Sequence, residues 1–137
     1  MHDAEQADFD EAVCAELLRT QRIGRLVYQE PGGPQVRPVN YLVIGEHIVV
    51  RMDRPFTDDT RVMFEIDSID TIAEEGWSVI VEGRAFSIPL DDVRQAEPAP
   101  WAPGPKGWST TIVIDSISGR YVKAGRDHRS QSAHGYL

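Results

Sequence analysis

Asn40 and Arg51 are the polar side chains whose positions could do chemistry in the stretch 36–51, VRPVNYLVIGEHIVVR. The alternation of apolar residues about a central Gly-Glu predicts a β-hairpin. Pro38 cannot donate to a strand ladder, so it indicates an edge or a bulge. Asn40 needs hydrogen-bond partners if it is buried, and the edge of a heteroaromatic ring can supply them. Arg51 ends the hairpin with a planar guanidinium that suits a phosphate group.

The charge balance of the chain allows a second interpretation of the arginines. The sequence has 22 acidic and 14 basic residues and a formal net charge of -8. Arg37 and Arg51 could therefore pair with the surplus carboxylates, and spacing alone favours neither interpretation. The same net charge repels phosphate backbones and anionic lipids, so we expect no nucleic-acid or membrane partner.

The remaining reactive residue types predict no catalytic or metal site. Glu65, Asp67 and Asp70 alternate with apolar residues along a strand, which favours a solvated face over an acid/base pair. Cys14 falls on the apolar stripe of a predicted helix, so we interpret it as a small buried hydrophobe. No metal-ligand spacing is found among the four histidines, which are His2, His47, His128 and His134.

Periodicity predicts one helix followed by short strands in a single domain, 1–137. The helix covers 9–20, with Asp8 or Asp10 as its cap, and a short second helix covers 90–96. The predicted strands are 25–30, 35–44, 46–52, 61–67 and 77–88, followed by a final pair at 109–114 and 119–123. We expect the ends, 1–8 and 124–137, to be flexible or docked on a partner.

This element pattern indicates a mainly β fold, because a closed antiparallel barrel hides the edges of many short strands. A single cysteine, the lack of a charged-then-apolar leader and the lack of any apolar run near 20 residues lead us to expect a cytoplasmic protein.

Five segments in this order and spacing resemble one family: RIGRLVY, RPVNY, IVVR, FEIDSID and GWSVIVEGRA. The chain resembles the small bacterial FMN-binding split-barrel proteins related to pyridoxamine 5'-phosphate oxidase. The resemblance implies a six-stranded antiparallel split β-barrel with an N-terminal helix and one or two short helices. It also implies a homodimer that holds flavin in two clefts at its interface.

The resemblance assigns roles to particular residues. Pro38, Val39, Asn40 and Tyr41 would lie along the isoalloxazine ring, and Arg51 would meet the phosphate. Trp77 and Ser78 would form part of the cleft wall and Trp108 would cover the ring, although each tryptophan taken alone is more typical of a barrel end. The full predicted cofactor-binding set is Arg37, Pro38, Val39, Asn40, Tyr41, Arg51, Arg54, Trp77, Ser78 and Trp108.

The segment RMDRPFTDDTRVMF departs from the family pattern. Such proteins usually have Arg-Thr, then a glycine turn with a phosphate-binding lysine that opens a helix. Here Met52 replaces the threonine, no lysine is present, and the segment is too short for that helix. Arg54 would stand in for the missing cation and Thr57 would add a hydroxyl.

The resulting hypothesis is a homodimeric, FMN-binding oxidoreductase that acts on a small molecule of unknown identity. No residue in the sequence stands out as an acid/base catalyst. The alternative is a binding module without chemistry, or one for a deazaflavin or a tetrapyrrole, in which the phosphate site has degenerated.

Overall fold

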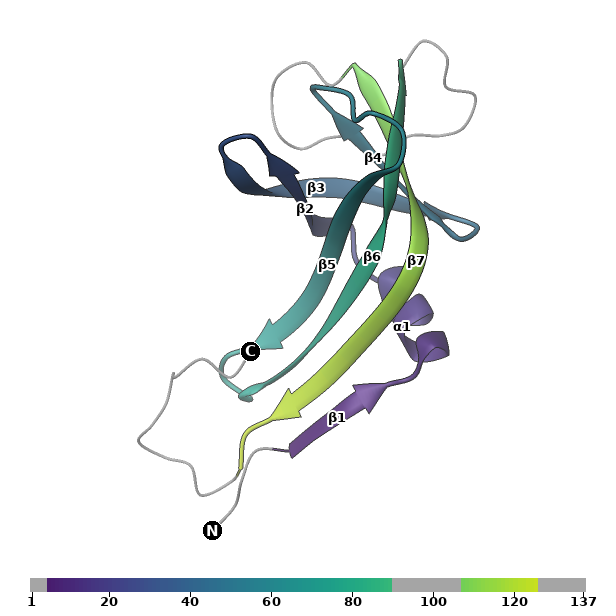
Figure 1. Cartoon of the computed structure of the whole chain (residues 1–137). Coiled ribbons are helices and arrows are strands. Elements are labelled where there is room, and N and C mark those ends of the chain that lie inside the picture. The colour runs from purple at the N-terminus through teal and green to yellow at the C-terminus, as the bar shows by residue number, and fades with distance from the viewer. Residues whose placement is uncertain (1–4, 90–106, 126–137) are drawn as a thin grey trace.

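The structure is a computed structural model, and it describes residues 5–89 and 107–125. One helix and seven strands follow each other along these residues (Figure 1). The elements are β1 (Glu5–Phe9), α1 (Glu11–Leu18), β2 (Ile23–Glu30), β3 (Gly33–Ile44), β4 (His47–Met52), β5 (Thr60–Asp70), β6 (Glu75–Pro89) and β7 (Trp108–Lys123).

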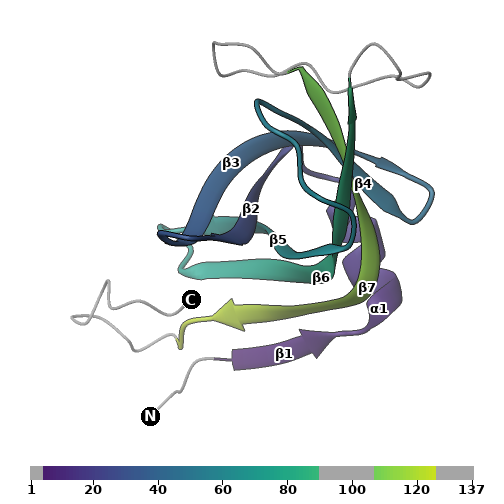
Figure 2. The same cartoon turned by 45° about the horizontal axis from the view of Figure 1, so that its top comes forward.

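Six of the strands close into an antiparallel barrel. The sheet order is β1-β7-β4-β3-β2-β5-β6, and an additional pairing of β6 with β7 joins the two sides. Figure 2 shows the ring of strands β2 to β7, with β1 added beside β7. Closure pairs the strands that would otherwise be edges. The predicted six-stranded split barrel is therefore confirmed.

Alternation along the strands gives the barrel an inner and an outer face. On β4, Ile48, Val50 and Met52 are buried in the core. On β2, Leu26 and Tyr28 point to the same interior. Residues at the intervening positions therefore belong to the outer face, which is where a ligand or a second chain could approach the sheet.

Helix α1 begins at the predicted cap, because the Asp10 carboxylate accepts a hydrogen bond of 2.9 Å from the Val13 N–H. Its residues Cys14 and Leu18 are buried in the core. A Cβ at Gly119 would come within 2.9 Å of the Cys14 sulfur, so glycine at this position lets helix and strand approach closely. Cys14 is thus the buried hydrophobe that the sequence predicts.

Two predictions about the chain's ends and last strands were wrong. Residues 109–123 form part of one continuous strand, β7, and do not form a hairpin. Of the expected turn, residues 116–118 pair with β6, and Asp115 lies at a register shift in this pairing. Residues 5–8, expected to be flexible or docked on a partner, belong to β1 and pair with β7 of the same chain. The predicted helix at 90–96 and most of the tail lie outside the described residues. No helix in 5–89 or 107–125 has the length and hydropathy needed to cross a membrane.

Candidate functional site

Strand β3 has one side that β4 leaves open. It pairs with β2 from Gly33 to Asn40, but its ladder with β4 runs only from Tyr41 to Ile44. Pro38 lies in the part that pairs with β2 alone, which explains how a proline is tolerated inside a long strand. The predicted ring-binding stretch therefore coincides with an edge of β3 that no described strand covers.

Asn40 and Arg51 are neighbours across this point. Tyr41 and Val50 form the last pair of the β3–β4 ladder, so Asn40 and Arg51 are the next residue on each strand. Both lie on the outer face. The register extends the row to Ile23 on β2 and to Ser109 on β7, which faces Arg51. The row thus brings together the amide of Asn40, the guanidinium of Arg51 and the hydroxyl of Ser109, and only Ser109 is distant from the other two in sequence.

Ser109 is the residue of this row that the sequence analysis missed. Its side chain is 3% exposed, and it is one of two buried polar residues in the described barrel. Because the hydroxyl has no catalytic motif beside it in sequence, only the β4–β7 register connects it with Arg51. Nothing in the local sequence, where Ser109 lies between Trp108 and Thr110, marks it as a buried residue.

The other predicted residues divide between the two faces. Pro38 and Ser78 share the outer face with Asn40, since Pro38 faces Arg25 and Ser78 faces Asp67. The other six members of the predicted set lie elsewhere. Arg54 follows β4, and the rest lie at inner-face or barrel-end positions: Arg37, Val39, Tyr41, Trp77 and Trp108.

The side chain of Tyr41 is buried in the core. It is 4% exposed, its hydroxyl donates a 2.6 Å hydrogen bond to the Leu18 carbonyl, and its ring meets Phe64 edge-on at 4.9 Å between centroids. Burial raises the pKa of Tyr41 to about 12, against a smaller opposing effect of a hydrogen bond with the Gln21 backbone. This side chain holds the end of α1 to the barrel.

The segment after β4 contains no helix, as the sequence predicted. Arg54 reaches Glu30 at 2.7 Å and Asp53 at 3.8 Å, and Arg37 lies 3.6 Å from the same Asp53. Arg37 therefore pairs with a carboxylate, in agreement with the second of the two interpretations made from the sequence. A phosphate approaching Arg54 would have to compete with two carboxylates that already contact it.

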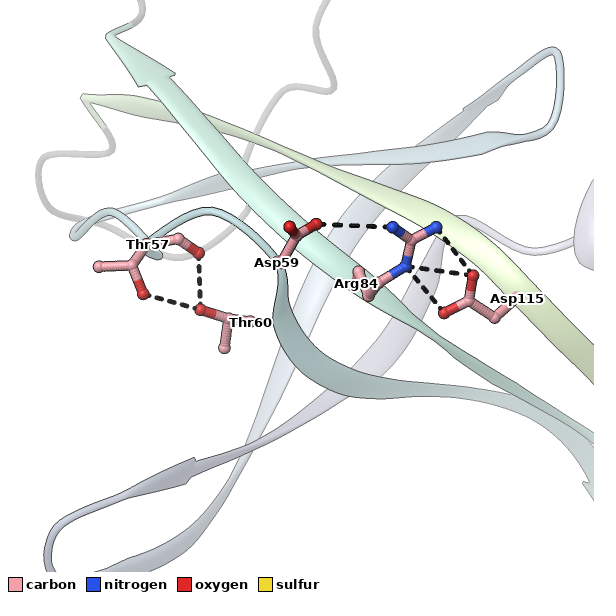
Figure 3. A network of polar contacts seen from close by, with 5 residues as sticks. All are labelled: Thr57, Asp59, Thr60, Arg84 and Asp115. Atoms are coloured by element: carbon pink, nitrogen blue, oxygen red, sulfur yellow. Dashed lines mark hydrogen bonds and ion pairs between the residues drawn. The ribbon is translucent and has the colours of Figure 1, made fainter.

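The far end of this segment is tied to the β6–β7 pair (Figure 3). Arg84 on β6 donates hydrogen bonds of 3.0 to 3.2 Å from Nε and Nη2 to Asp115 on β7, and its Nη1 lies 3.5 Å from Asp59. The side-chain hydrogen bond to Arg84 lowers the pKa of Asp115. The Thr57 carbonyl accepts a 2.6 Å hydrogen bond from Thr60 Oγ1, which closes the turn before β5. Thr57 therefore serves this turn.

A second polar group on the outer face joins Arg25 of β2 to two carboxylates of β5, and we name it the Arg25 cluster. Arg25 Nε lies 3.2 Å from Glu65, and its Nη2 lies 2.5 Å from Asp67. The side chains are partly buried, with 26% of Glu65 and 21% of Asp67 exposed. Asp70 stands apart and caps the turn at Ile72. The predicted solvated face is thus only partly exposed at Glu65 and Asp67.

The protonation of the Arg25 cluster is unusual. Burial, the hydrogen bond with Asp67 and the charge of Asp67 raise the pKa of Glu65 to about 7, although Arg25 acts in the opposite direction. Two carboxylates that share one guanidinium titrate as a pair. Near pH 7 Glu65 is therefore about half protonated, whereas an ordinary glutamate would have lost its proton.

Apolar side chains surround these polar groups on the outer face. Several are exposed by more than a third: Leu42, Met63, Ile69, Ile80, Phe86 and Ile88. Met63 and Ile69 lie on the same face of β5 as Glu65, and Ile80 faces Glu65 from β6. Exposed apolar side chains gathered on one face are typical of an interaction site.

The sequence from residue 10 to residue 121 matches the model of the pyridoxamine 5'-phosphate oxidase family. Because the match covers most of the chain, the chain belongs to this family. An uncharacterised protein of Mycobacterium tuberculosis, Rv0080, is 31% identical over 93 residues. That alignment covers 61% of this chain and 60% of the relative, so the chain spans about three fifths of the length of that protein.

Solved structures support the same fold. A Corynebacterium glutamicum protein provisionally named as a pyridoxamine 5'-phosphate oxidase is 25% identical, with a TM-score of 0.68 over 88% of this chain and 96% of its own. An FAD-binding protein of Mesorhizobium loti also has a TM-score of 0.68, at 22% identity, 88% of this chain and 98% of its own. An FAD-binding protein of Mycobacterium smegmatis has a TM-score of 0.63, at 23% identity, 85% of this chain and 98% of its own.

Proposed function

We propose that this chain binds a flavin nucleotide at the open edge of β3 and acts as an oxidoreductase on a small molecule. The single observation that carries the proposal is the placement of Asn40 beside Arg51, where β3 loses its β4 partner. An amide and exposed main-chain groups match the donors and acceptors at a flavin ring edge. A guanidinium in the same row matches the phosphate.

The residues of the described chain fit such a cofactor by chemistry. Asn40 would orient the ring edge, Arg51 would neutralise the phosphate, and Ser109 would supply a hydroxyl from the neighbouring strand. A bound flavin supplies the hydride or electron transfer itself, and the protein supplies position, charge and exclusion of water. Tyr41 would contribute through its main chain, since its side chain belongs to the core.

We propose FMN as the first candidate cofactor, because the resemblance is to the FMN-binding branch. FAD is the second candidate, and two neighbours that bind FAD by name support it. The engagement of Arg54 with Glu30 and Asp53 also favours a weak terminal-phosphate site. A weakened phosphate contact lowers the affinity for FMN more than the affinity for FAD, because the larger nucleotide makes further contacts.

We also propose a homodimer in a reducing cytoplasm. The exposed apolar side chains of the outer face would be covered by a second copy, which would complete each cleft. The family resemblance and the row of Asn40 and Arg51 on this same face support the pairing. A single, buried cysteine is compatible with a reducing compartment.

The test is an absorption spectrum of the purified protein, followed by titration with FMN, FAD and riboflavin while tryptophan fluorescence is recorded. We expect flavin absorbance, or quenching that saturates with micromolar or tighter affinity for at least one nucleotide. A colourless protein that binds none of the three flavins contradicts the proposal. The alternative hypothesis, a binding module for another ligand, then remains. Light scattering on the same sample measures whether two chains associate.

A further inference from the structure

We infer that the carboxylate of Asp53 competes with the cofactor phosphate for the guanidinium of Arg37. This role rests on the proposed flavin site and concerns how strongly that site binds a phosphate. Asp53 has no part in the proposed contacts with the flavin ring. Its charge therefore lowers the affinity for FMN and leaves the affinity for riboflavin, which has no phosphate, unchanged.

Asp53 lies where strands β3 and β4 separate. The ladder between these strands ends at the pair Tyr41 and Val50, and Asp53 is the first residue after β4. Its carboxylate lies 3.6 Å from Arg37 Nη1, on β3, and 3.8 Å from Arg54 Nε. The edge of β3 that is proposed to hold the flavin therefore has a carboxylate of the same chain beside it.

The two arginines at Asp53 differ in their other partners. Arg54 Nη1 lies 2.7 Å from Glu30, which is closer than its contact with Asp53. Arg37 makes no ion pair except the one with Asp53 within residues 5–89 and 107–125. Loss of the Asp53 charge therefore frees the guanidinium of Arg37, while Arg54 keeps its contact with Glu30.

The pair of Arg37 and Asp53 is accessible to a dissolved anion. About a third of each side chain is exposed, 34% for Arg37 and 35% for Asp53. Ion pairs at such exposure are weak, because water and salt screen them. A phosphate monoester carries a charge of roughly -1.5 to -2 at neutral pH and has three acceptor oxygens. It can therefore replace a carboxylate at a guanidinium.

The phosphate that is proposed to meet Arg51 is close to this pair. Arg51 and Asp53 are two positions apart, so their Cα atoms are separated by at most about 7 Å. Charges at this distance still interact, since the screening length is about 8 Å at physiological ionic strength. The Asp53 carboxylate thus repels a phosphate at Arg51, and a freed Arg37 would attract it.

The test measures the dissociation constants of FMN and riboflavin by titration of tryptophan fluorescence. Asp53→Asn should tighten FMN about threefold to tenfold and leave riboflavin unchanged. Arg37→Ala should change FMN binding little in the natural chain, because Asp53 already occupies this arginine. In the Asp53→Asn background, Arg37→Ala should remove most of the gain, and this non-additivity identifies the pair.

Glu46→Gln is the matched control for net charge. It removes one negative charge in the β3–β4 turn, at the other end of β4 and about 20 Å along the chain from Asp53. It should leave FMN binding nearly unchanged, since that distance exceeds the screening length. Circular dichroism spectra establish that each variant is folded.

The outcomes separate this role of Asp53 from the proposed function. If the natural chain binds FMN and Asp53→Asn does not tighten it, or tightens riboflavin equally, the competition is overturned and the flavin site stands. An equal gain in Glu46→Gln, or a gain that survives Arg37→Ala, also overturns the competition for Arg37. If neither the natural chain nor Asp53→Asn binds either flavin, the proposed function is overturned, and this role with it.

Discussion

Glu65 carries a proton at a pH where an ordinary glutamate has lost it. Its pKa is about 7 in the folded chain, against 4.5 as the ordinary value. Between these values the folded chain binds more protons than the unfolded chain, so the free energy of unfolding falls as the pH rises from about 4.5 to about 7. The ionised form of Glu65 therefore opposes folding at neutral and alkaline pH.

Replacement of Glu65 by glutamine should remove this pH dependence. We expect Glu65→Gln to increase the free energy of unfolding, relative to the natural chain, by about 1 kcal/mol more at pH 8 than at pH 5, after allowance for solvent screening. The variant is therefore expected to gain stability at the higher pH. Urea unfolding at the two pH values measures the difference. An equal effect of the substitution at both pH values would show that Glu65 titrates normally.

Tyr41 and Tyr28 are both buried tyrosines, but only the hydroxyl of Tyr41 has a partner in the described chain. Tyr41 donates to Leu18, whereas Tyr28 Oη is buried without a hydrogen bond among these residues. Tyr41→Phe should lower the free energy of unfolding by about 1 to 2 kcal/mol, because it leaves a buried carbonyl unsatisfied. Tyr28→Phe is the matched control and should cost little or stabilise the fold. Chemical denaturation that ranks the two variants in the opposite order would contradict these contacts.

At the scale of the elements, strand β2 depends on close contact with β5. A Cβ at Gly24 would lie 2.2 Å from the Phe64 ring, which is fully buried. Gly24→Ala should therefore force the core apart and cost about 1 to 3 kcal/mol. Gly32→Ala, in the β2–β3 turn with no atom within 4 Å of the added carbon, is the control and should leave the melting temperature nearly unchanged. Equal melting temperatures for both variants would contradict the packing of Phe64 against β2.

Local patterns in the sequence predicted most elements of this fold. Alternation located β2 to β6 within a few residues, and Asp10 marked the start of α1. The last strand was misjudged because Gly119 reads as a turn residue, although its role is close contact with Cys14. Strand β1 escaped prediction because its polar residues are held by main-chain pairing with β7, which leaves no apolar pattern.

The site was predictable only in part, because its neighbours come from strands that are distant in sequence. Asn40 and Arg51 share one hairpin, so their proximity follows from the turn between them. Ser109 joins them only through the β4–β7 register. The Arg25 cluster requires β2 to lie beside β5, an order that alternation within single strands does not encode.

At the scale of the whole molecule, an acidic barrel is proposed to bind an anionic cofactor. The formal net charge of -8 disfavours any phosphate that lacks a local cation. Among the predicted cations, Arg37 and Arg54 each contact Asp53, and Arg54 also contacts Glu30. We therefore propose that Arg51 meets the phosphate and that Arg54 belongs to the turn after β4.

The most direct measurement compares the dissociation constants of FMN and riboflavin for the natural chain and for Arg51→Ala. Riboflavin has the same ring without the phosphate, so only FMN should lose a charge-assisted hydrogen bond, worth about 1.5 to 3 kcal/mol. We predict that the substitution weakens FMN about tenfold to a hundredfold and leaves riboflavin nearly unchanged. Equal losses for both ligands, or no binding of either by the natural chain, would contradict the assignment of Arg51 to a flavin phosphate.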